Sequence, residues 1–161
     1  MLIYRVETCI SLFGIDKKVP AGIGPYGTRD MMRHELGRRE YTNEQLIEKL
    51  AIERYVRNNM LFLFSHEECK MDTHPAPTSD RRLMQSFEDK GERPVIRGYN
   101  FGFKDVDQLK KWFNQNSRNN LHLQGYYVAI YEVEQAHVGD TQCVFLKDEA
   151  ELVGFISCLE V

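Results

Sequence analysis

The chain has 161 residues, 42% of them hydrophobic and 28% charged, which is enough for one hydrophobic core but not for two independent ones. A formal net charge of -3 argues against a protein that holds nucleic acid across a basic face. Because no apolar run approaches the ~20 residues that span a bilayer and the first residues lack the apolar region of a secretory signal, we expect a single-domain cytoplasmic protein.

The first predicted element is a strand from about Leu2 to Thr8, because "LIYRVET" is short and rich in strand-forming residues. On that strand Arg5 shares a face with Ile3 and Glu7, since strand neighbours alternate faces. An arginine on a half-apolar face either pairs with a carboxylate or holds an anion.

Glycines and prolines in "VPAGIGPYGTRD", residues 19–30, predict a loop. Its backbone at Gly24 can cradle a phosphate and Tyr26 can stack on a flat ring, although the loop lacks the spacing of known phosphate motifs. Thr42 and Gln45 then form a capping box for a helix that reaches about Asn58.

The next segment carries scattered polar groups that are candidate ligands. His66, Cys69 and His74 are spaced like part of a zinc site, but a fourth ligand is lacking in the sequence, so we predict no metal site. His74 and Asp80 can instead lie at a pocket mouth, or in a solvated loop. The four cysteines form no Cys-x-x-Cys pair, as is typical of reduced cytosolic thiols: Cys9, Cys69, Cys143 and Cys158.

The second half has the clearest pattern. It predicts a weak helix near 81–87, strands at 95–103, 125–134, 141–146 and 152–161, and a helix from Asp105 to Gln115. Asp105 is placed as the N-cap of that helix, and the apolar stripe that includes Trp112 is expected to pack on a sheet. The order of elements predicts an α+β fold with a mixed or antiparallel sheet and flanking helices.

Gly102, between Phe101 and Phe103, marks a place where a ligand or another backbone comes close. Tight packing against a neighbouring strand explains it equally well. Glu132 and Glu134 share one strand face and either activate a hydroxyl or form the solvated side of a sheet.

The order of "LIYRVE", "GPYG", "HPAP", "NFGFKDVDQLKKWF", "GYYVAIYEVE" and "QCVF" is similar to a group of small proteins of phages and prophages. The resemblance covers most of the chain except about residues 28–65, where the helix is a possible insertion. More distantly, a first strand with an arginine, an aromatic strand followed by a helix, and later strands ending in Glu or Gln resemble the ADP-ribosyltransferase-like fold.

The second resemblance implies a cleft that grips NAD. In it Arg5 contacts a phosphate or ribose, and the strand from Phe101 to Phe103 walls the nicotinamide pocket. Gln142 is the preferred match for the third position, with Glu132 or Glu134 as alternatives. The expected catalytic residues are therefore Arg5, Gln142 and Glu132, and the expected ligand contacts are Arg5, Gly24, Tyr26, His74, Asp80, Phe101 and Phe103.

Three functions follow from these patterns. The first is a mono-ADP-ribosyltransferase that uses NAD to modify a host protein in host takeover or counter-defence. Since Gln142 cannot supply the carboxylate that such chemistry needs, the second is a binder that sequesters a nucleotide, such as a cyclic immune signal. The third is an inhibitor that blocks a host defence protein through its surface.

Overall fold

The computed structural model describes residues 1–11, 18–20, 24, 74–94, 96 and 98–161. Several predictions fall outside these residues: the helix from Thr42 to Asn58, the insertion over 28–65, and the ligand candidates Tyr26, His66 and Cys69.

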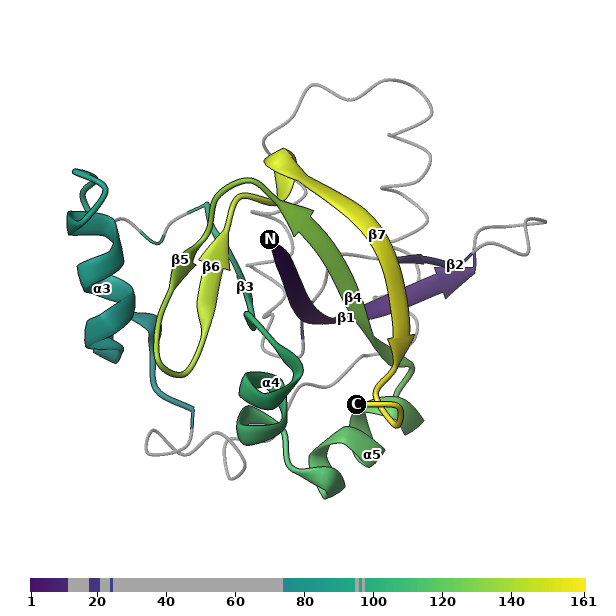
Figure 1. The fold of residues 1–161 in the computed structure, drawn as a ribbon. Helices are drawn as coiled ribbons and strands as arrows, with labels where there is room; N and C mark the ends of the chain where they lie inside the picture. The colour runs from purple at the N-terminus through teal and green to yellow at the C-terminus, as the bar shows by residue number, and fades with distance from the viewer. Residues whose placement is uncertain (12–17, 21–23, 25–73, 95, 97) are drawn as a thin grey trace.

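The described part of the chain contains two antiparallel sheets (Figure 1). The larger has the order β2-β1-β4-β7, formed by Lys18–Pro20, Leu2–Ser11, Tyr126–Val133 and Ala150–Ser157. The smaller has the order β3-β6-β5, formed by Asn100–Gly102, Cys143–Phe145 and His137–Val138. Backbone hydrogen bonds of 2.8 Å in both directions between Tyr4 and Phe103 join the two sheets at β1.

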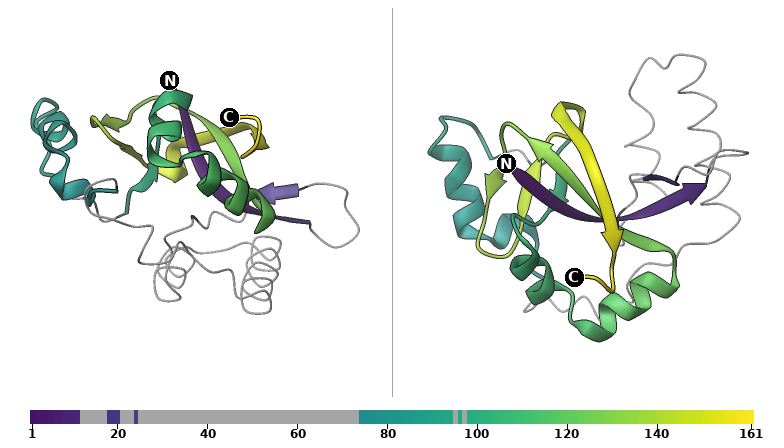
Figure 2. Two further views of the ribbon diagram at one scale, coloured as in Figure 1. Left: turned by 90° about the horizontal axis from the view of Figure 1, so that it is seen from below. Right: turned by 45° about the vertical axis from the view of Figure 1, so that its right-hand side comes forward.

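Helices cover the outer faces of both sheets, as Figures 1 and 2 show. The helices α4 (Val106–Trp112) and α5 (Gln115–Leu123) pack on one face of the larger sheet, where Val6, Val128 and Phe103 belong to their core cluster. The opposite face packs on the smaller sheet through a second cluster: Ile3, Ala129, Tyr131, Val133, Cys143 and Phe145. The helix α3 (Arg81–Glu88) covers the far side of the smaller sheet through Leu83, Phe87 and Val144.

The α+β class and the antiparallel pairing are thus confirmed for the described residues. Two short 3-10 helices, Pro77–Ser79 and Lys147–Glu149, complete the elements.

The helix predicted from Asp105 to Gln115 is in fact two helices. Asp105 does cap α4, accepting a hydrogen bond of 2.7 Å from the backbone N–H of Gln108. Phe113, however, has extended backbone (φ -110, ψ 102), and Asn114 caps α5 through the N–H of Ser117 at 3.0 Å. The prediction missed α5 because a second N-cap inside the run starts a new helix.

Other boundaries also differ from the prediction. The strand expected over 95–103 is shorter, since β3 begins at Asn100 after Gly98, whose positive φ of 98 breaks the extended run. The prediction that a loop begins at Val19 was wrong for its first two residues, because Lys18–Pro20 form β2 and pair with the end of β1. Proline is tolerated there because it lies at the end of an edge strand.

Gly102 is held between the two sheets with no space for a side chain. A Cβ atom at this position would lie 2.5 Å from Ile3 Cγ2, 3.1 Å from the carbonyl oxygen of Tyr4 and 3.3 Å from Phe145 Cε1. The close approach of β3 to β1 therefore explains why a glycine lies between the two phenylalanines.

We expect Gly102→Ala to lower the free energy of unfolding by about 1–3 kcal/mol, because the added methyl overpacks the junction of the sheets. Urea denaturation measures the change. Gly154→Ala on β7 is the matched control, since apart from its chain neighbours no residue has a heavy atom within 4 Å of the position that its added methyl would occupy. Equal stability of the two variants would contradict the tight junction.

Candidate functional site

A buried cluster of charges lies on β1 and the segments beside it. Arg5 Nε contacts Glu7 Oε1 at 2.6 Å, Lys147 Nζ contacts the same oxygen at 2.9 Å, and the hydroxyl of Tyr131 donates to Glu7 Oε2 at 3.0 Å. Glu7 is fully buried, while the side chain of Lys147 is 28% exposed. The cluster therefore reaches from the core to the surface through Lys147.

The partners of Glu7 stabilise its ionised form. Burial alone would raise the pKa of this carboxyl, but the charges of Lys147 and Arg5, with hydrogen bonds from Lys147 and Tyr131, bring the pKa below its ordinary value of 4.5. Glu7 is consequently an ionised carboxylate that compensates two cations inside the protein.

Arg5 meets Phe101 and Gly24 at this cluster. Its Nη1 donates to the backbone carbonyl of Phe101 at 2.6 Å, and its Nη2 lies 3.4 Å from where a Cβ of Gly24 would be. The rings of Phe101 and Phe103 point elsewhere: Phe101 packs against the α3 cluster and Phe103 belongs to the core beneath α4 and α5. Three predicted ligand contacts thus come together, but only the backbone of the aromatic strand faces Arg5.

Asp80 is the centre of a second polar group, at the turn between β5 and β6. It accepts hydrogen bonds from the backbone N–H groups of Leu83 at 3.1 Å, Asp140 at 3.2 Å and Thr141 at 2.9 Å, and from the Thr141 hydroxyl at 2.8 Å. Burial opposes ionisation, but these bonds, led by that of the Thr141 N–H, lower the pKa of Asp80 below its ordinary value. The Asp80 carboxylate also occupies the space that a side chain on Gly139 would need.

Gln142 and His74 lie near that second group. Gln142 is 3% exposed and donates to the carbonyl of Pro75 at 3.0 Å. His74 is within 2.8 Å of the Trp112 carbonyl, and its ring packs edge-on against the Trp112 ring at 4.9 Å. These contacts hold the segment before α3 against β6 and α4.

Glu132 lies apart from Arg5. Tyr131 and Ala129 share the face of β4 that carries Arg5 on β1, so Glu132, between Tyr131 and Val133, points to the opposite face. It is exposed, as is Glu134 just beyond the strand. The structure therefore brings together Arg5, Gly24 and the Phe101 backbone. Asp80 and the segment that Gln142 contacts form a separate group. Glu132 is not close to Arg5.

Sequence reasoning placed Glu7 on the face of Arg5 without naming it as the partner, and it missed Lys147. The position of Glu7 two residues after Arg5 was the available signal, because it places both on one strand face. Lys147 had no such signal, since it is 140 residues away from Glu7.

Two general features of the described part bear on function. Among its residues no group of three histidine, cysteine, aspartate or glutamate side chains is arranged to hold a metal ion. No helix in the described ranges is long and apolar enough to cross a membrane.

The family described as Bacteriophage T4 Y00F protein matches residues 1–159. A protein of Enterobacteria phage T4, described as an uncharacterized 19.7 kDa protein in the motB-dexA intergenic region, is 41% identical over 61 residues. That stretch covers 37% of this chain and 37% of the T4 protein. No solved structure matches the chain, so the ADP-ribosyltransferase-like fold stays a prediction.

We expect Glu7→Gln to lower the free energy of unfolding by about 3–5 kcal/mol, because Arg5 and Lys147 lose the buried carboxylate that both contact. The depressed pKa of Glu7 stabilises the fold above pH 4.5, and that contribution is lost as the pH falls through the folded-state pKa. Urea denaturation between neutral and acid pH should therefore show a flatter acid limb in the variant. The exposed Glu132→Gln is the control, and an equal loss of stability in both variants would argue against the cluster.

Proposed function

The chain belongs to the bacteriophage T4 Y00F protein family, and we propose that it is a binding protein that contacts a host or defence protein through the strand β7. The carrying observation is the apolar surface of this strand. Leu152, Val153 and Phe155 are 39%, 49% and 37% exposed, and β7 is at the edge of the larger sheet in the described part of the chain.

The local geometry of β7 gathers these side chains. The pairing with β4 shifts by one residue at Val153, so that Leu152 pairs with Tyr131 and Phe155 pairs with Ala129. Since Tyr131 and Ala129 share a face of β4, Leu152 and Phe155 also lie on one face, although they are three residues apart. Clustered exposed apolar side chains are typical of protein contact sites, where aromatic residues are enriched.

The use of the polar residues within the fold also favours binding over catalysis. Arg5 is engaged by Glu7 and the Phe101 carbonyl, and Asp80 accepts bonds from four donors on three residues. These contacts give the expected catalytic and ligand residues a role in stability. A protein contact through the surface does not require the expected catalytic and ligand residues to lie together in one cleft.

A nucleotide-binding cleft is the second candidate, and the contact between Gly24 and Arg5 favours it. Gly24 lies close to the Arg5 guanidinium, and Lys147 belongs to the same charge cluster, so backbone and cations together suit a phosphate. NAD and cyclic nucleotides are the ligands to test, and ADP-ribosyl transfer to a host protein is the reaction that would consume NAD.

The surface contact predicts that immobilised protein retains a specific protein from an enterobacterial lysate. A variant with Leu152→Ser and Phe155→Ser should retain roughly tenfold less, as expected when an aromatic anchor of an interface is removed. Leu123→Ser is the matched control, because Leu123 is 82% exposed on α5. Equal retention by both variants, with both melting like the wild type, would overturn the role of β7.

The surface contact also predicts that NAD and cyclic nucleotides neither stabilise the protein nor change when incubated with it. Melting scans and chromatography of each nucleotide after incubation measure both properties. A ligand at about 100 times its dissociation constant would add about 2.7 kcal/mol of stability. Stabilisation with intact ligand would instead support nucleotide sequestration, and cleavage of NAD would support the transferase.

A further inference from the structure

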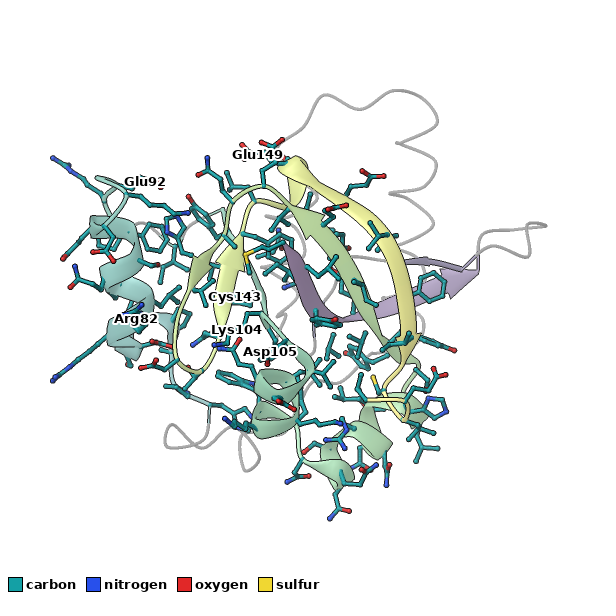
Figure 3. All side chains as sticks on the ribbon, in the orientation of Figure 1. Arg82, Glu92, Lys104, Asp105, Cys143 and Glu149 are labelled. Carbon is teal, nitrogen blue, oxygen red and sulfur yellow. The ribbon has the colours of Figure 1, made fainter. Side chains whose placement is uncertain are left out.

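A pocket of about 220 Å³ lies where the loop after α3 meets the segments that flank β5 and β7. Glu92 follows α3 and Glu149 directly precedes β7, and Figure 3 shows these two residues at the same edge of the molecule. The pocket is lined by Glu92, Tyr99, Gln135, His137, Leu146 and Glu149.

The size of the pocket limits its occupant. Pockets for drug-sized ligands measure about 300–1,000 Å³, whereas a single buried water needs only about 15 Å³. A volume of about 220 Å³ therefore suits one side chain or a group of similar size better than a nucleotide.

The lining attracts a cation. Glu92 and Glu149 contribute two carboxylates, and both act on the same phenol: burial first, then the charges of Glu92 and Glu149, raise the pKa of Tyr99. Both carboxylates therefore lie near the Tyr99 hydroxyl. A hydrogen bond with Glu92 also raises the pKa of Tyr99, so its hydroxyl stays neutral at pH 7.

His137 lines the pocket and contributes a buried polar ring beside Glu92. It is 3% exposed, and its ring stacks on Phe87 with centroids 3.5 Å apart and meets Tyr99 edge-on at 5.6 Å. Its Nε2 lies 3.3 Å from Glu92 Oε2, while its buried Nδ1 has no hydrogen-bond partner in the described part of the chain. When Nε2 carries the proton toward Glu92, Nδ1 is an acceptor that lacks a donor.

We propose that this pocket, defined by Glu92, Tyr99, His137 and Glu149, receives an arginine side chain of the protein that β7 contacts. Two carboxylates beside an aromatic side chain match a planar guanidinium, which carries five N–H donors and stacks on aromatic rings. Glu149 is adjacent to the first residue of β7, so the pocket continues the proposed contact surface. The inference rests on the proposed function for the source of the arginine.

The direct test titrates the isotope-labelled full chain with N-acetyl-arginine methylamide and follows the backbone amide signals by NMR. We expect saturable shifts at Tyr99, His137 and Leu146. Glu92→Gln and Glu149→Gln should each weaken binding roughly two- to fivefold, as for a partly exposed ion pair. Glu132→Gln, an exposed glutamate on the far face of β4, should leave the affinity unchanged.

Three results would overturn the proposal: no saturable shift, equal shifts with the uncharged N-acetyl-glycine methylamide, or tighter binding of N-acetyl-lysine methylamide. The lysate experiment separates this failure from that of the proposed function. If β7 substitutions abolish retention while the arginine derivative does not bind, the surface contact stands and the pocket has no part in it.

Discussion

The fold depends on a buried carboxylate, Glu7, that compensates Arg5 and Lys147 where the two sheets meet. Taking such charges out of water costs several kcal/mol for each ion, and only close pairing with full hydrogen bonding offsets that cost. Arg5 also binds the Phe101 carbonyl, so the same ion pair connects β1 to β3. Register errors in β1 would turn both charges to the opposite face, away from these partners.

A second polar arrangement complements this ion pair at the other end of the smaller sheet. Asp80 caps α3 and also binds the turn between β5 and β6, while Gln108 on α4 donates to the carbonyls of Gly139 and Asp140 at 3.1 Å. Two segments far apart in sequence, α3 and α4, are thereby fixed to one turn. The position of His137 in the pocket follows from this, because His137 lies in β5 just before that turn.

Local patterns predicted the local structure well. The shared face of Arg5 and Glu7, the Asp105 cap and the strand at Tyr126–Val133 all depend on neighbours within a few residues. Features that depend on distant contacts were not predictable. The two explanations of Gly102 differ only in whether Ile3 and Phe145 lie against it, and no local pattern places them there. The pocket likewise joins residues from 92 to 149, so spacing gives no sign of it.

Residue types that suggest ligand sites also stabilise folds through their hydrogen bonds and ion pairs. In this protein the buried polar residues have that structural role. Arginine, aspartate and glutamine were attractive candidates because they bind anions and transfer protons, yet the same donors and acceptors satisfy β1, α3 and β6. Residues that have no evident role in stabilising the fold are therefore better candidates for a functional site. Leu152 and Phe155 stay partly exposed on β7, and Glu92 and Glu149 line one pocket. The proposed partner, with an apolar surface and an arginine, would cover the first group and pair with the second.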